Sequence, residues 1–273
     1  MRIRRIAVLI DGGFFLKRLP KVVEPKFRDN PDAVADTARI LCKRHVQRLI
    51  GEPRSAQESR WLDHVYRLFY YDASPYEGVS HHPVLNRRIS FGTTDQAAFR
   101  RELFNALRRK RKFALRLGKV VKEGDWQISS RLTKQLVKTG EWLSILDDYL
   151  HARDVPPPPL SEDRSREFEK LIAAWRSLDA GNVALGLRQK GVDMRIGLDI
   201  ASLALKRQAD TIILVTGDSD FVPAAKFARR EGVEFILDPM RQSISDDLFE
   251  HIDGLVSPLQ RDTPADRDAS DDS

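Results

Sequence analysis

The chain has 273 residues, and its 46 lysines and arginines against 40 aspartates and glutamates give a mild net charge of +6. Cys42 is the only cysteine, which excludes a disulfide framework and a thiolate zinc site. No apolar run approaches the roughly 18 residues of a membrane-spanning helix, and none has the form of a signal peptide. We therefore expect a cytoplasmic protein without a membrane partner.

The N-terminal part of the chain predicts strands and helices in alternation. Apolar runs predict strands over 6–10, 64–71 and 113–121, and helical periodicity predicts helices over 32–49 and 99–111. The residues from Phe14 to Leu19 begin a helix or a loop that Pro20 interrupts. Arg100 and Arg101 open a basic run through the second helix, which fits an RNA-binding stripe and a solvated helix face equally well.

The middle of the chain loses this regularity. Helices are expected over 131–150 and from Ser161 to about Leu178, joined through the polyproline segment 156–159. The α/β pattern then resumes, with strands over 211–216 and 233–237 and helices over 198–208 and 222–230. We predict a discontinuous core (1–121 and 183–257), a helical insertion with a polyproline linker (122–182) and a disordered acidic tail (258–273).

Carboxylates follow the two most apolar strands. The run from Ile6 to Ile10 stops at Asp11, and the run from Thr211 to Thr216 is followed by Gly217-Asp218-Ser219-Asp220. Ligands in open α/β sheets bind beyond the carboxyl ends of the strands. If both strands are central and parallel, Asp11, Asp218 and Asp220 meet at one edge of the sheet.

Two more carboxylates lie between these motifs in the sequence. Asp193 ends a short segment, and Asp199 opens a helical pattern. Asp11, Asp199, Asp218 and Asp220 would repel one another at short range without a cation. All-oxygen ligands suit Mg²⁺ or Mn²⁺. We expect these four to bind the ion and to be catalytic, and we leave open whether Asp193 joins them.

The same residues carry a resemblance to a known family. In chain order, IDGG (10–13), KGVD (190–193), LD (198–199) and VTGDSDFVP (215–223) resemble the NYN domains of the PIN-like nuclease superfamily, in particular the LabA/DUF88 branch. The resemblance implies a doubly wound, mainly parallel α/β sheet and a divalent-metal ribonuclease centre at Asp11, Asp199, Asp218 and Asp220. It also implies RNA as the partner, and the oligomeric state stays open.

The candidate substrate-binding residues lie within or beside these motifs: Lys17, Arg18, Lys190, Arg195, Thr216 and Ser219. Phe14 departs from the family pattern D-G-x-N, in which an asparagine occupies its position. This departure keeps open an alternative function, an RNA-binding or assembly module with weak or no catalysis.

A third interpretation is a haloacid-dehalogenase-like phosphatase, which also has GDSD after a strand. That chemistry requires a second acid two residues after the nucleophile, where this chain has Gly13. The interpretation that we favour is hydrolysis of RNA phosphodiester bonds with Mg²⁺ or Mn²⁺.

Overall fold

The computed structural model describes residues 4–53, 59–151 and 160–259. Its strands are β1 (Ile6–Asp11), β2 (Val65–Ser74), β3 (Val79–His82), β4 (Arg87–Ser90), β5 (Phe113–Ile128), β6 (Val183–Lys190), β7 (Thr211–Val215), β8 (Glu234–Asp238) and β9 (Gly254–Leu255). Its helices are α1 (Gly12–Val22), α2 (Pro31–Ile50), α3 (Asp95–Arg109), α4 (Ser130–Leu136), α5 (Thr139–His151), α6 (Glu162–Arg176), α7 (Val192–Leu205), α8 (Val222–Arg230) and α9 (Asp246–Glu250). No helix among the described residues is both long and apolar enough to cross a membrane.

The described residues divide into two compact units. The first contains 1–76, 92–120 and 189–273, and the second contains 77–91 and 121–188. The predicted insertion 122–182 falls within the second unit, which also takes in the short hairpin β3–β4 and most of β6. The polyproline segment 156–159 and most of the predicted tail lie outside the described residues.

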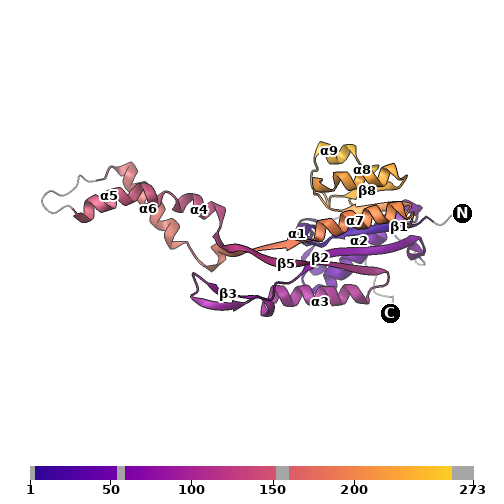
Figure 1. Ribbon diagram of the computed structural model, residues 1–273, viewed down its shortest axis with the longest axis horizontal. Helices are drawn as coiled ribbons and strands as arrows, with labels where there is room; N and C mark the ends of the chain where they lie inside the picture. Colours follow the sequence, from indigo (N-terminus) through magenta and orange to yellow (C-terminus); the bar gives the residue numbers. More distant parts are fainter. Residues whose placement is uncertain (1–3, 54–58, 152–159, 260–273) are drawn as a thin grey trace. The chain divides into compact units, whose positions relative to one another are not determined.

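A mainly parallel sheet is the centre of the fold, in the order β6-β5-β2-β1-β7-β8-β9 (Figure 1). The pairs β1–β2, β1–β7, β2–β5, β7–β8 and β8–β9 are all parallel. The predicted α/β class with a parallel sheet is therefore confirmed. β1 is the central strand, β7 lies beside it, and both are almost wholly apolar, as strands covered on both faces must be.

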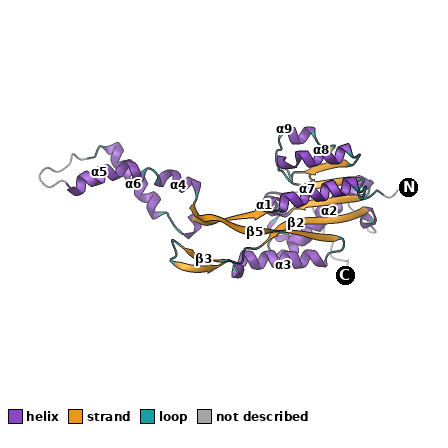
Figure 2. Cartoon of the chain, in the orientation of Figure 1, coloured by secondary structure: helices purple, strands orange, loops and turns teal. Residues whose placement is uncertain are grey.

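Helices cover both faces of this sheet (Figure 2). Alternate residues of β1 divide between two cores: Ile6, Val8 and Ile10 pack with α1, α2 and α3, and Ala7 and Leu9 pack with α7 and α8. The period-two alternation of a strand thus produces the doubly wound arrangement. α2 is bounded as its sequence predicts, with Asn30 capping its first turn and Gly51 ending it at φ 72°.

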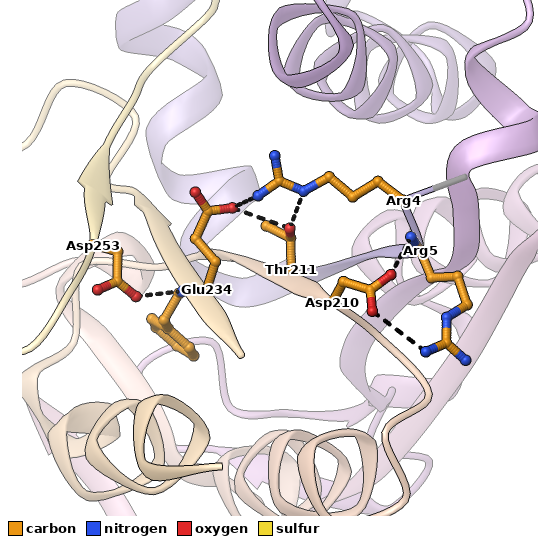
Figure 3. A network of polar contacts seen from close by, with 7 residues as sticks. Arg4, Arg5, Asp210, Thr211, Glu234 and Asp253 are labelled. Carbon is orange, nitrogen blue, oxygen red and sulfur yellow. Dashed lines mark hydrogen bonds and ion pairs between the residues drawn. The ribbon is translucent and has the colours of Figure 1, made fainter. Parts of the chain in front are cut away.

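The amino-terminal edge of the sheet is held by ion pairs (Figure 3). The Arg4 guanidinium donates to the Thr211 hydroxyl at 2.7 Å and pairs with Glu234. The backbone N–H of Arg5 donates to the Asp210 carboxylate at 2.8 Å. These contacts tie the residues before β1 to β7 and β8, and they fix the register at the edge opposite to the one where the predicted carboxylates follow the strands.

Several parts of the chain differ from the sequence-based expectation, among them α1, which continues through Pro20 to Val22. The helix expected over 131–150 is two helices, α4 and α5. β5 continues to Ile128, beyond the expected end at Val121. In the second unit, a Cβ on Gly186 would lie 3.0 Å from the carbonyl oxygen of Glu123, so β6 runs close against this extension.

Candidate metal centre at the carboxyl edge of the sheet

Carboxylates from four elements gather where the parallel strands end. Asp11 is the last residue of β1, Asp72 lies near the end of β2, and Asp193 is in the first turn of α7. Asp218 and Asp220 belong to the turn between β7 and α8. The strands deliver these residues to one edge because they run in parallel.

Asp11 is held by the turn that it caps. Its Oδ1 accepts the backbone N–H of Phe14 at 3.1 Å, and its Oδ2 accepts the Thr216 hydroxyl at 3.4 Å. Burial is the main reason that the pKa of Asp11 rises to about 6, and the nearby charges of Asp193 and Asp72 raise it further. The two hydrogen bonds act in the opposite direction and are outweighed.

Asp193 connects the two ends of this cluster. Its charge acts on Asp11, and its own pKa is raised by partial burial and then by the charges of Asp218 and Asp220. The Asp218 carboxylate accepts the backbone N–H of Asp220 at 3.0 Å, which fixes the turn that presents both side chains. Asp193 therefore lies near enough to Asp11, Asp218 and Asp220 for their charges to interact.

Asp199 lies in a different environment from these four. It accepts the Tyr71 hydroxyl at 2.8 Å and the Arg116 Nε–H at 3.1 Å. Six residues of an α-helix turn through about 600° and rise about 9 Å, so Asp193 and Asp199 do not share a face of α7. The sequence interpretation began this helix near Leu198, whereas it begins at Val192. Because α7 begins at Val192, Asp193 lies in its first turn near the other carboxylates. Asp199, which the sequence analysis assigned to the metal, lies beside Arg116 instead.

Asp72 is a member of the site that the sequence analysis missed. It is fully buried and ion-paired with Arg100 of α3, and its Oδ1 accepts the Gln189 side-chain amide at 3.3 Å. Burial raises its pKa, while Arg100 is the largest opposing influence. One feature of the sequence could have identified Asp72 as a site residue, because it follows a predicted strand in the way that Asp11 does. Arg100 thus pairs with a buried carboxylate. Neither an RNA-binding stripe nor a solvated helix face, the two interpretations of the basic run on α3, predicted this contact.

Two glycines allow the backbone to close around the site. A Cβ on Gly12 would lie 2.6 Å from both Cε1 of Tyr70 and the carbonyl oxygen of Tyr71. A Cβ on Gly217 would lie 2.8 Å from Cε2 of Phe14. The Phe14 ring therefore packs directly against the turn that carries Asp218, and it is joined to the core on the α1 side of the sheet.

The candidate substrate-binding residues have varied partners. The Arg18 guanidinium donates to the Met240 carbonyl at 2.8 Å, and Arg195 donates to the Gly191 carbonyl at 2.7 Å, so both hold backbone. Thr216 is fully buried, and its Oγ1 also accepts the Asp218 backbone N–H at 3.3 Å. Lys17 and Ser219 are exposed at the edge, and Lys190 ends β6.

The donor set suits a hard divalent cation. It consists of carboxylate oxygens, and the raised pKa of Asp11 shows that its charge is poorly compensated by the protein alone. Among the described residues, the group whose potential ligand atoms all lie within 4.8 Å of one another is instead Asp247, Glu250 and His251, near α9. The wider spacing at the sheet edge fits an ion that retains several waters, as Mg²⁺ does.

Comparison with known proteins finds a similarity to one family in the C-terminal part of the chain. The NYN domain model matches residues 163–257, which include Asp193, Asp218 and Asp220. No curated protein matches the chain. A solved structure of a protein of unknown function from Vibrio parahaemolyticus is 14% identical, with a TM-score of 0.36, over 94% of this chain and 96% of the other.

Proposed function

We propose that the protein is a divalent-metal-dependent ribonuclease of the LabA/DUF88 branch, with Asp11, Asp193, Asp218 and Asp220 as its metal-binding carboxylates. The observation that carries the proposal is the half-buried carboxylate of Asp11, whose pKa is raised to about 6 beside the charges of Asp193 and Asp72. A cation among these groups replaces repulsion with attraction. The NYN match supports RNA as the substrate class.

Each residue of the site has a distinct task in this proposal. Bound Mg²⁺ or Mn²⁺ supplies an activated water and neutralises charge that develops on the phosphate. Asp11, Asp193, Asp218 and Asp220 would provide ligand oxygens for this ion. The Thr216 hydroxyl holds the Asp11 carboxylate in place and accepts the backbone N–H of Asp218, so it aligns the two halves of the site.

Asp199 has a supporting role in this scheme. Tyr71 remains a hydrogen-bond donor to Asp199, because burial raises the pKa of its phenol well above the ordinary value. Arg116 of β5 completes this contact. Asp199 thereby fastens α7 to β2 and β5, and it holds the helix whose first turn presents Asp193.

The direct test is cleavage of a labelled RNA with and without EDTA. Wild type should cleave only with Mg²⁺ or Mn²⁺, and Asp11→Asn or Asp193→Asn should lower the rate by orders of magnitude with the fold retained. Glu231→Gln, which changes an exposed carboxylate at the C-terminal end of α8, is the control and should leave the rate unchanged. Cleavage that survives both EDTA and Asp11→Asn would refute the proposal.

A catalytically weak RNA-binding module remains the second candidate, and Phe14 is the observation that favours it. The ring fills the space beside Gly217 where a smaller polar side chain would leave room for a ligand. This alternative predicts RNA binding that EDTA does not affect, without cleavage by wild type. The same labelled RNA, in a binding assay, separates the two candidates.

A further inference from the structure

An apolar stripe runs along the outward face of α7. Met194, Leu198 and Leu205 have 71%, 64% and 61% of their surface exposed, the highest values for large hydrophobic side chains among the described residues of the first unit. With half-buried Ala201 they follow a spacing of four, three and four residues. This spacing places all four on one face of a helix, opposite the face that Ile196, Ile200 and Leu203 bury against the sheet.

The stripe is complementary to itself in the antiparallel direction. Reversing α7 about a point between Asp199 and Ile200 places Met194 opposite Leu205 and Leu198 opposite Ala201. Large side chains then meet at both ends, and a large one meets a small one near the middle. The residues flanking the stripe, Gly197 and Ser202, are also small, which permits close approach of two helix axes.

The charges at the two ends of α7 also favour antiparallel pairing of two copies of this helix. The amino-terminal end lies at the acidic edge of the sheet, where Asp193 is close to Asp218 and Asp220. The carboxyl-terminal end is followed by exposed Lys206 and Arg207. An antiparallel pair brings the basic end of each helix toward the acidic edge of the other copy, and it also aligns the helix dipoles favourably.

We propose that the outward face of α7 is a homodimer interface, in which two copies of the chain pair through Met194, Leu198, Ala201 and Leu205 about a two-fold axis. Exposed apolar stripes of this kind are unusual on a monomer and mark contact surfaces. The two-fold axis makes the contact isologous, so it closes at two copies. The arrangement also places Lys206 of the partner subunit toward the acidic edge, where the RNA backbone would lie.

The first experiment measures mass in solution. Sedimentation velocity on the full chain should show a concentration-dependent dimer for wild type and a monomer for Leu198→Glu. Leu143→Glu, which changes a leucine of 60% exposure on α5, is the matched control and should remain dimeric. Because both positions are exposed, circular dichroism should show that both variants fold. A monomeric wild type at high-micromolar concentration, or a dimer that Leu198→Glu leaves intact, overturns the proposal.

The second experiment tests the direction of pairing with engineered cysteines. Two Met194 positions in the antiparallel pair are about 16 Å apart at 1.5 Å per residue, beyond the reach of a disulfide. Met194→Cys mixed with Leu205→Cys should therefore form interchain disulfides under mild oxidation, whereas either variant alone should not. Native Cys42 is fully buried and does not compete. Cross-linking of Met194→Cys alone as fast as the mixture would overturn the antiparallel arrangement.

Discussion

At the scale of single residues, the site is defined by carboxylates whose surroundings raise their pKa and so disfavour the ionised form. Asp72 is buried, Asp11 is half-buried and Asp193 is exposed at the surface, and loss of hydration is the first cause of the raised pKa of each. Among the described ion pairs of these three residues, an arginine contacts Asp72. Arg100 thus compensates one carboxylate within the protein, and in our proposal a cation compensates the others.

The first prediction concerns stability against pH in EDTA. Asp11 binds its proton more tightly in the folded state, since its pKa rises from 3.8 to about 6. Wild type should therefore lose stability as pH increases from about 4 to about 6, by on the order of 1–3 kcal/mol, and stay lower above that range. Asp11→Asn keeps the cap of α1 and should lack this loss. Urea unfolding of both proteins at pH 4 and pH 8 measures it. An Asn variant less stable than wild type at pH 8 would contradict the assignment.

The second prediction concerns the buried ion pair. Arg100→Met removes the cation from Asp72, which is fully buried, and should cost about 3–5 kcal/mol of unfolding free energy. The double variant Arg100→Met with Asp72→Asn should recover much of that loss, because no uncompensated charge remains. Denaturant unfolding of the two single variants and the double variant gives the coupling energy. Additive losses would mean that the pair is not a stabilising unit.

At the scale of elements, the sequence predicts the buried strands well and the start of α7 poorly. The apolar runs of β1 and β7 can only be strands covered on both faces, and the helix predicted over 222–230 has the bounds of α8. α7, by contrast, begins after Gly191 at φ 77° with no side-chain cap, and Gly197 lowers its intrinsic propensity. Packing of Val192 and Ile196 in the core forms these first turns. Local sequence signals do not reveal this packing. For that reason the sequence did not decide whether Asp193 joins the other carboxylates.

The far part of β5 was missed for a related reason. Beyond Val121 the strand is mostly exposed and charged, so it has no alternating apolar pattern. Its partner is β6, from a distant part of the sequence, against which Gly186 packs closely. Asp72 was overlooked in the same way, since its ion pair with Arg100 joins β2 to α3 across 28 residues.

The third prediction tests the close packing between the start of α1 and β2. Gly12→Ala places a methyl group 2.6 Å from the Tyr71 carbonyl oxygen and from the Tyr70 ring, in a region where the backbone cannot easily move. We expect a loss of about 2 kcal/mol or more, typical of overpacking in a core. Gly140→Ala on α5 is the matched control, because nothing lies within 4 Å of its added Cβ. It should be neutral or stabilising by up to about 1 kcal/mol. Equal melting temperatures for the two variants would contradict this packing.

At the scale of the whole molecule, the chain passes several times between its two units, yet each has its own packed interior. The first unit holds the large core on both faces of the sheet and all of the acidic site. The second has a smaller cluster of Leu132, Leu136 and Ala174, together with a ring contact between Trp142 and Phe168 at 4.8 Å between centroids. The chemistry proposed for the site therefore depends on residues of the first unit alone.

The last prediction follows from the way the helical segment is connected. The backbone N–H of Ser129 donates to the Asn182 carbonyl at 2.8 Å, so the ends of β5 and β6 meet where the three helices α4, α5 and α6 are attached. Replacing residues 130–181 with Asn-Gly should close the two strands through a two-residue hairpin turn. The shortened chain should unfold cooperatively, and millimolar Mn²⁺ should raise its melting temperature as it does for wild type, since every carboxylate of the site is retained.

Asp11→Asn in the shortened chain is the control for this experiment and should reduce the response to Mn²⁺. Failure of the shortened chain to fold would show that the helical segment stabilises the first unit. A cooperative fold without a Mn²⁺ response would show instead that the metal centre requires a residue of the deleted segment. Because the carboxylates lie on β1, α7 and the turn after β7, all outside the deleted range 130–181, we expect both folding and the Mn²⁺ response to survive.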